Sequence, residues 1–352
     1  MTEGKTLFYI YATMSCNLSC VHCYVPSSPN IKIKNELSTE EIFKIIDFAH
    51  KKNVREIRLT GGEPLIRKDI IDIINYATSK GLFVSIETNG LLISEEFLQS
   101  LKDPLKVSFG VSLDGPKEIH EKIRGKGTFD KTVNSIVLLK KYNINYTIIT
   151  SVVDHSWILD NRLEEFANFL LHLFPKIWYV HAWISTEGRG KLIKVDVHTL
   201  YQVIKRVYEL KIKMRDKLRV ALNVPLGAIP KEFINDILQD EDISIGCKYW
   251  QIVGFSSTGD VSICHRFTKF PEMSAGNIRL NNLEEIMKSK ILGKLNRKVE
   301  GVCSKCIIFD YCQGFCLADI YSYYGDLNHS HPLCQLFYEN GLFNDYLLKT
   351  DE

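Results

Sequence analysis

The residues whose types and spacing most clearly suggest chemistry are three cysteines in one short loop. Cys16, Cys20 and Cys23 follow the pattern Cys-x3-Cys-x2-Cys, directly after an apolar segment at 7–12. An iron–sulfur cube takes one soft thiolate per iron, so four cysteines close a [4Fe-4S] cluster and three leave one iron open. A structural zinc site needs four ligands, and the local fourth candidate, His22, lies between two of the cysteines. The spacing therefore favours a cluster with an open iron over a zinc knuckle.

This stretch resembles the signature of the radical S-adenosylmethionine (SAM) superfamily. In that superfamily an aromatic residue before the last cysteine, here His22, packs near the adenine of the cofactor. The resemblance implies that SAM chelates the open iron and that the reduced cluster gives it one electron. A carbon–sulfur bond then breaks, and the resulting 5′-deoxyadenosyl radical removes a hydrogen atom from the substrate.

The composition of the chain is that of a soluble, globular protein. Its 352 residues are 45% hydrophobic and 24% charged, with a net charge of +2. This length accommodates either two ordinary domains or one α/β barrel with an appended segment, and the charge lacks the strong basic field typical of nucleic-acid binding. No apolar run reaches the length of a membrane span and no signal peptide is evident, so we expect a cytoplasmic protein without nucleic-acid or membrane partners. Ten cysteines in such a chain indicate metal or redox chemistry rather than disulfides.

Strands and helices alternate after the cysteine loop. The predicted strands lie at 7–12, 55–60, 82–87, 106–112, 145–153 and 177–183, and the predicted helices at 38–52, 68–80, 94–101, 129–141 and 161–173. Such alternation indicates parallel pairing with right-handed crossovers. We therefore predict an α/β fold, a partial (β/α)6 TIM-type barrel, with its motifs at the C-terminal ends of the strands.

The composition changes near residue 240. A long helix is expected at 196–215, and 219–242 is expected to be connecting structure with a short helix. We predict one domain at 1–240, the barrel with its connecting helices, and a second at 241–352 that ends in a helix. The second domain holds seven cysteines and few long apolar segments, so metal ligation is expected to contribute to its folding.

The cysteines of the second domain have a specific spacing. The pattern is Cys247-x11-Gly259-x4-Cys264, then Cys303-x2-Cys306-x5-Cys312-x3-Cys316, and finally Cys334. It resembles the SPASM domain of radical SAM peptide-modifying enzymes, which holds two auxiliary [4Fe-4S] clusters. The resemblance implies that the whole chain carries three [4Fe-4S] clusters and binds SAM.

The family pattern also implies which cysteines hold each auxiliary cluster. The far auxiliary site would consist of Cys303, Cys306, Cys312 and Cys334, and the near auxiliary site of Cys247, Cys264 and Cys316. Fully ligated members complete the near site with an eighth cysteine soon after the first. Residues 248–258 contain none, which leaves an open iron there. A substrate thiolate, a water or a small thiol would each suit that position.

Two further motifs resemble SAM-binding segments of the family. Gly61, Gly62, Glu63 and Pro64 match its GGEP motif, whose strand-end groups accept hydrogen bonds from the ammonium of SAM and whose glycines permit close approach. Ser112, which begins an SLDGP segment, and Arg124 would hold the SAM carboxylate, a role that suits a hydroxyl donor and a guanidinium fork. The alternative for Arg124 is an exposed charge at a helix end.

Other polar residues follow predicted strands. Glu87 and Asn89 lie at the end of the third strand and are expected to contact the ribose or the substrate. Glu187 and Arg189 follow the sixth strand and would face the same mouth of the barrel, with an ordinary turn as the alternative.

His265 follows Cys264 in a Cys-His-Arg-Phe stretch. Some SPASM enzymes carry at this position an Asp that acts as the base in formylglycine formation, so His265 argues against that activity. The stretch is similar to that of enzymes that build thioether or other crosslinks in ribosomal peptides. His265 could take a proton near neutral pH and is a candidate catalytic residue, with a structural histidine as the alternative.

The predicted function is hydrogen abstraction from a ribosomally made peptide, followed by a modification for which we favour a thioether (C–S) crosslink. Other peptide chemistry stays open, namely a C–C or ether crosslink, epimerisation or decarboxylation. So do a radical SAM enzyme of cofactor or tetrapyrrole biosynthesis and a cluster-carrying electron-transfer protein without SAM cleavage. The expected partners are the peptide and an electron donor such as flavodoxin or ferredoxin. Because the first strand begins at about Leu7, with no winged domain before it, we also expect a separate leader-binding protein or a peptide bound by the barrel itself.

Overall fold

One sheet of ten strands organises the protein in the computed structural model, which describes residues 5–25, 27–182, 187–192, 194, 196–233, 235–236 and 246–349. The strands are β1 (Leu7–Thr13), β2 (Glu56–Gly61), β3 (Phe83–Thr88), β4 (Val107–Ser112), β5 (Asn145–Ser151), β6 (Trp178–His181), β7 (Val220–Leu222), β8 (Ile252–Phe255), β9 (Asp260–Ser262) and β10 (Ser274–Asn277). Their order is β10-β9-β8-β1-β2-β3-β4-β5-β6-β7. The pairs from β8 to β7 are parallel, and β9 and β10 add an antiparallel edge.

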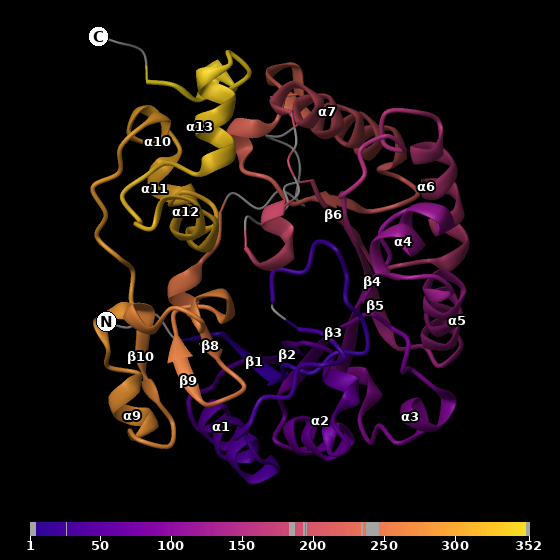
Figure 1. The fold of residues 1–352 in the computed structure, drawn as a ribbon, viewed down its shortest axis with the longest axis vertical. Helices are drawn as coiled ribbons and strands as arrows, with labels where there is room; N and C mark the ends of the chain where they lie inside the picture. Colours follow the sequence, from indigo (N-terminus) through magenta and orange to yellow (C-terminus); the bar gives the residue numbers. More distant parts are fainter. Residues whose placement is uncertain are drawn as a thin grey trace.

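The connecting helices pack on the outside of the parallel strands (Figure 1). They are α1 (Thr39–Lys51), α2 (Ile70–Ser79), α3 (Glu95–Gln99), α4 (Lys117–Arg124), α5 (Thr128–Lys141), α6 (Arg162–Leu173) and α7 (Val197–Met214). The first begins with a capping box in which Ser38 and Glu41 each bind the other's backbone N–H, as its sequence predicts. The parallel strands with helices packed outside them confirm the predicted α/β fold and partial barrel.

The two faces of the sheet differ in polarity. Ile10, Leu59, Ile86 and Phe109 lie in register on neighbouring strands and are at most 1% exposed, and burying such side chains contributes roughly 1.5–3 kcal/mol each. Residues at alternate positions point to the opposite face. There Arg58 donates from Nη1 to the Tyr9 hydroxyl at 2.7 Å. The apolar layer therefore fixes the strands while polar side chains line the other face.

The sheet extends further than the sequence predicts. Residues 219–242, expected to be connecting structure, contain β7, which at three residues is too short to show a strand periodicity. Helix α4, after β4, was also not predicted. At the other side β8 pairs with β1, with Leu7 opposite Ile252, so the C-terminal region continues the barrel sheet. The predicted boundary near 240 lies outside the described residues and stays a prediction.

The C-terminal region contains β8, β9 and β10 and several short helices. The helices are α9 (Leu283–Ile286), α10 (Val302–Lys305), α11 (Phe309–Cys312), α12 (Leu317–Tyr324) and α13 (Pro332–Glu339), the last being the predicted terminal helix. Figure 1 shows this orange to yellow part of the chain lying between the β1 side of the sheet and α7. Within the described residues, no helix is long and apolar enough to cross a membrane.

Candidate active site

The cysteine loop that the sequence singled out follows β1 on the C-terminal edge of the parallel strands. Cys16 and Cys20 are buried, and Cys23 is half-buried. Burial raises the pKa of the Cys16 thiol to about 11, and the neighbouring Cys20 and Cys23 also raise it. All ten cysteines are free thiols. Bound iron would supply the positive charge that stabilises such buried thiolates, so the loop suits the cluster that its spacing predicts.

The glycines of the GGEP motif make room for this loop. The Gly62 N–H donates to the Thr13 carbonyl at 2.7 Å, and the Glu63 N–H donates to the Ser15 carbonyl at 2.8 Å. A Cβ on Gly61 would lie 2.2 Å from the Thr13 oxygen, and one on Gly62 would lie 2.1 Å from the Ser15 oxygen. Gly61 and Gly62 are thus required because the backbone at the start of the cysteine loop passes so close to them. Their contact with SAM stays a prediction.

Glu63 ties this motif to the next strand. It is 1% exposed and its carboxylate accepts hydrogen bonds from the Thr88 hydroxyl and the Asn89 N–H, both at 2.8 Å. The Asn89 side-chain amide in turn donates to the Asn17 side chain in the cysteine loop at 2.7 Å. Burial raises the pKa of Glu63. In the structure Glu63 and Asn89 therefore position the loop through protein contacts, and Pro64 begins the buried turn beneath it.

Arg124 is buried beside the cysteine loop, which excludes the exposed alternative. Its Nη1 lies 3.8 Å from Cys20 Sγ, and its Nε donates to Asp114 Oδ2 at 2.5 Å. The Asp114 carboxylate also accepts from the Ser151 N–H at 2.9 Å. Burial alone would raise the pKa of Asp114, but the positive charge of Arg124, its hydrogen bond and the neighbouring His22 and His120 together lower that pKa. Ser112 ends β4 near this pair, and the role of Ser112 and Arg124 in binding the SAM carboxylate stays a prediction.

Replacing Arg124 by glutamine is expected to destabilise the protein by about 3–5 kcal/mol, because the Asp114 carboxylate would stay buried without its cation. The double variant Arg124→Gln with Asp114→Asn removes both charges and is expected to recover part of this loss. Urea unfolding of both variants measures the difference. A single variant as stable as the unmodified protein would show that the ion pair has no structural role.

The polar face of the barrel carries Glu87 and reaches His265. Glu87 accepts from the Thr60 hydroxyl at 2.9 Å and lies 4.0 Å from Arg58. His265 stacks on Tyr9 with 4.1 Å between ring centroids. Burial lowers the pKa of His265 to about 3, which disfavours the protonation near neutral pH that the sequence suggested. The stacking favours the structural alternative, and a catalytic role for His265 stays a prediction.

The turn after β6 contacts the cysteine loop directly. The Arg189 N–H donates to the Cys23 carbonyl at 2.9 Å, and its Nε donates to the Cys20 carbonyl at 2.7 Å. A Cβ on Gly188 would lie 2.4 Å from the Cys23 oxygen. The neighbouring Glu187 is 4% exposed and turns toward the C-terminal region. The turn at 187–190 therefore supports the cysteine loop through hydrogen bonds to two of its backbone carbonyls.

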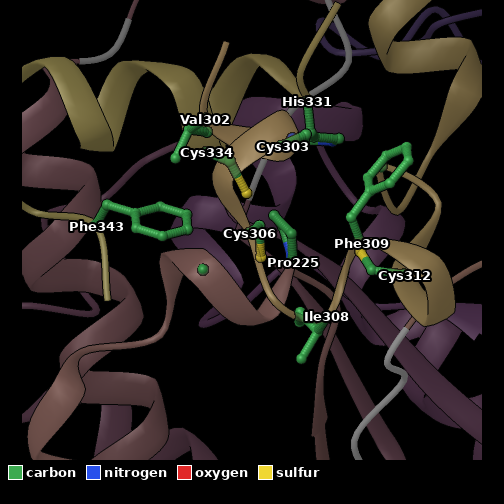
Figure 2. A pocket seen from close by; sticks show the side chains of 12 residues that line it. Pro225, Val302, Cys303, Cys306, Ile308, Phe309, Cys312, His331, Cys334 and Phe343 are labelled. Carbon is green, nitrogen blue, oxygen red and sulfur yellow. The ribbon is translucent and has the colours of Figure 1, made fainter. Parts of the chain in front are cut away.

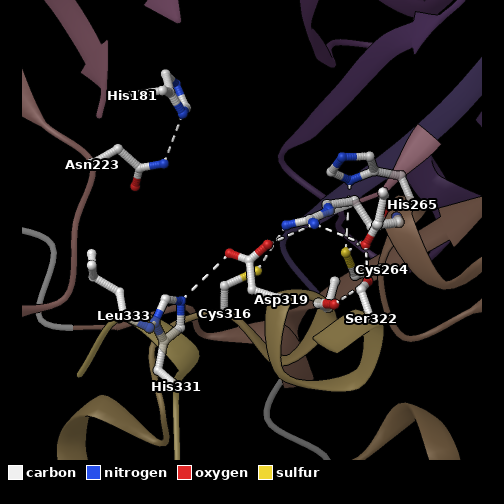
Figure 3. Close-up of polar contacts among 12 residues, drawn as sticks. His181, Asn223, Cys264, His265, Cys316, Asp319, Ser322, His331 and Leu333 are labelled. Atoms are coloured by element: carbon white, nitrogen blue, oxygen red, sulfur yellow. Dashed lines mark hydrogen bonds and ion pairs between the residues drawn. The ribbon is translucent and has the colours of Figure 1, made fainter. Parts of the chain in front are cut away.

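The three cysteines of the near auxiliary site converge beside this turn. The Cys247 N–H donates to the Phe315 carbonyl at 3.2 Å, which sets Cys247 next to Cys316. Figure 3 shows Cys264 and Cys316 facing the same group of polar side chains. Burial raises the pKa of Cys316, and the charges of Cys247 and Cys264 contribute in the same direction. The predicted ligand set is thus assembled from three separate parts of the chain.

The four cysteines of the far auxiliary site line one pocket (Figure 2). Its walls also include His331 and Phe343, and Pro225 after β7. No group of three or more His, Cys, Asp or Glu side chains within the described part of the chain is arranged to hold a single metal ion. Four thiols around one pocket suit a bulkier centre, the [4Fe-4S] cluster that the resemblance to the SPASM domain implies.

Comparison with known families agrees with this geometry. The radical SAM superfamily profile matches residues 10–170, and that of the iron–sulfur cluster-binding SPASM domain matches residues 247–307. The chain is a radical SAM enzyme with a SPASM domain. Its cofactors are SAM and three [4Fe-4S] clusters, as predicted.

This radical SAM enzyme has relatives of two kinds. It is 29% identical over 349 residues to an AdoMet-dependent heme synthase of Methanosarcina barkeri, covering 95% of this chain and 97% of that protein. It is 28% identical over 315 residues to the mycofactocin maturase MftC of Mycolicibacterium smegmatis, covering 87% and 76%. The solved structure of SuiB from Streptococcus suis bound to precursor peptide SuiA has a TM-score of 0.74 at 18% identity, covering 94% and 76%. That likeness shows a shared fold.

Proposed function

We propose that this enzyme modifies a ribosomally made, cysteine-containing peptide and joins the cysteine sulfur to a carbon of another residue as a thioether. The observation that carries the proposal is the near auxiliary site, where Cys247, Cys264 and Cys316 meet and 248–258 add no cysteine. Thiolates are the ligands that iron–sulfur centres accept most readily, so a substrate thiolate suits the open position. A water or small thiol is the competing occupant.

The overall reaction balances as an oxidation. When bound, SAM and its cluster supply a 5′-deoxyadenosyl radical at the expense of one electron. The peptide loses one hydrogen atom from carbon to this radical and one proton from its thiol, and one electron leaves as the C–S bond forms. The two auxiliary centres are the proposed electron acceptors. A flavodoxin or ferredoxin is the proposed donor, and a leader-binding protein or the barrel itself would present the peptide.

The residues around the predicted site would keep bulk water from the reactants. Arg124, whose side chain is 10% exposed, pairs with the fully buried Asp114 next to Cys20, and the stacked Tyr9 and His265 lie beside Cys264. Buried charges and rings of this kind keep water from a reactive radical. Support for a peptide substrate also comes from the relatives, since MftC is a maturase and SuiB binds a precursor peptide.

A tetrapyrrole is the second candidate substrate. The alignment with the heme synthase spans 97% of that protein, more of its length than the alignment with the maturase MftC spans. A tetrapyrrole reaction needs no substrate thiol, so the open position of the near auxiliary site would then keep a water or a small thiol.

Parallel turnover assays of the reconstituted enzyme distinguish these candidates. A cysteine-containing precursor peptide is expected to lose about 2 Da per crosslink in mass spectrometry, and the same peptide with Cys→Ser should not. The cysteine peptide should also change the electron paramagnetic resonance (EPR) signal of the near cluster. Mass loss without that change in the EPR signal would argue for another peptide chemistry, such as a C–C or ether crosslink. Uptake of deuterium from D2O without the 2 Da loss would indicate epimerisation. Conversion of an iron porphyrin alone would favour the second candidate.

A further inference from the structure

Arg266 makes a direct contact with a cysteine sulfur of the near auxiliary site. Its Nη1 donates to Cys316 Sγ at 3.1 Å, and its backbone N–H lies 3.4 Å from Cys264 Sγ. The side chain is 14% exposed. A guanidinium keeps its positive charge at any physiological pH, so a fixed charge lies against Cys316, while the backbone N–H of the same residue faces Cys264.

Buried carboxylates hold this guanidinium in place. Its Nη2 pairs with Glu187 at 2.8 Å and with Asp319 at 2.7 Å, and neither carboxylate residue is more than 7% exposed. The two ends of the guanidinium therefore have different partners, with sulfur at Nη1 and oxygen at Nη2. Figure 3 shows Asp319 beside Cys316, with dashed lines to its partners. Because both carboxylates are almost entirely buried and pair with the same guanidinium nitrogen, they hold the cation in one position.

Glu187, which pairs with Arg266, belongs to the same turn that contacts the radical SAM cysteine loop. Glu187 precedes Gly188 and Arg189, whose contacts reach the carbonyls of Cys20 and Cys23. One three-residue segment thus touches the first cysteine loop on one side and, through Arg266, the near auxiliary site on the other. The position of Arg266 is set by the barrel and not by the C-terminal region alone.

We propose that Arg266 and Asp319 set the reduction potential of the near auxiliary cluster, Arg266 raising it and Asp319 lowering it. Hydrogen bonds to cluster sulfurs and nearby charges are the main protein levers on such potentials. Reduction adds negative charge to the cluster, which a neighbouring cation favours and a neighbouring carboxylate opposes. Arg266 and Asp319 are positioning residues, and the inference holds for either candidate substrate. It rests on the assignment of Cys247, Cys264 and Cys316 as ligands.

A redox titration of the reconstituted holoenzyme, followed by EPR, tests the two opposite shifts. Arg266→Gln is expected to move the midpoint potential of the near cluster to a more negative value, and Asp319→Asn to a more positive one. Arg266→Lys keeps the charge and should give a smaller shift than Arg266→Gln. Opposite signs cannot arise from a general loosening of the site, which would move both variants in the same direction.

Lys269→Gln is the matched control. Lys269 pairs with the same Glu187 carboxylate at 2.6 Å, so its removal disturbs the anchor without removing the charge at the sulfur. Its near-cluster potential should stay close to that of the unmodified enzyme. Equal potentials in Arg266→Gln and the unmodified enzyme, or shifts of the same sign in both main variants, would overturn the proposal. A near-cluster signal that persists in Cys316→Ala would instead overturn the ligand assignment.

Discussion

Gly62→Ala is expected to abolish SAM cleavage while leaving the barrel folded. The new Cβ would lie 2.1 Å from the Ser15 carbonyl oxygen, and a backbone oxygen cannot move aside by changing rotamer. An ordinary overpacked methylene costs about 1–3 kcal/mol, and this contact with fixed backbone should reach the top of that range or exceed it. The strain is relieved by displacing the loop that carries Cys16, so the geometry of the first cluster should be lost. A displacement worth about 3 kcal/mol corresponds to a rate loss of at least roughly 100-fold.

The measurement is 5′-deoxyadenosine formation by the reduced, reconstituted enzyme, with iron content determined alongside. Gly293→Ala serves as the control, because a Cβ at Gly293 would meet its nearest neighbour, the Lys290 oxygen, at 3.3 Å. Gly293→Ala should cleave SAM at nearly the normal rate. Normal cleavage by Gly62→Ala would show that the loop can shift without harm to the cluster.

The second large effect is expected from comparing Cys334→Ser with Cys23→Ser. Each change should remove about one third of the iron, because each breaks one of three similar clusters. Only Cys334→Ser should strongly reduce thermal stability. The far auxiliary site lies among helices of four to eight residues and Cys334 is 6% exposed, so its cluster occupies what would otherwise be a hydrophobic core. Cys23 is half-buried in a loop on a barrel that has its own apolar layer.

Calorimetry of the two variants under anaerobic conditions gives the comparison. Cys334→Ser should lower Tm by roughly 10 °C or more, since each kcal/mol shifts Tm by about 2–4 °C in proteins of a few hundred residues. Cys23→Ser should change Tm by much less. Similar losses of Tm in both variants would mean that the far cluster contributes no more to folding than the catalytic one does.

The sequence predicts most of the barrel because its strands and helices are long enough to show their periods. The helix beginning after Ser38 and the strand at 107–112 lie within two residues of where the pattern indicates. β7 and β8 escape prediction because strands of three and four residues carry no usable period, and pairing of β8 with β1 joins positions far apart in the chain. Such long-range pairing is decided by tertiary packing, which no local window contains.

The candidate site also has parts that the sequence predicts and parts that it does not. Cysteine number and spacing indicate iron–sulfur chemistry because that chemistry dictates residue type and number directly, and the resemblance to the SPASM domain predicts which cysteines form each ligand set. The supporting contacts have no such signature. These contacts join common residue types that lie far apart in the chain. Asn17 and Asn89 are 72 positions apart, Asp319 and Arg266 are 53 apart, and Arg189 and Cys20 are 169 apart. The motif pattern singles out Glu63 for SAM binding, which stays a prediction, and gives no sign that its carboxylate accepts hydrogen bonds from Thr88 and Asn89.

The pairing of β8 with β1 has a consequence for the order of events during synthesis. β1 carries the first cysteine loop, and one of its two edges is covered only by β8. A ribosome adds about 5–20 residues per second, so this edge waits on the order of ten seconds or more before Ile252 can reach it. An unpaired strand edge is a site for association with other chains. The nascent protein therefore passes through a period in which one edge of β1 is exposed. Binding of a chaperone to β1 during this period would prevent association with other chains until β8 is synthesised.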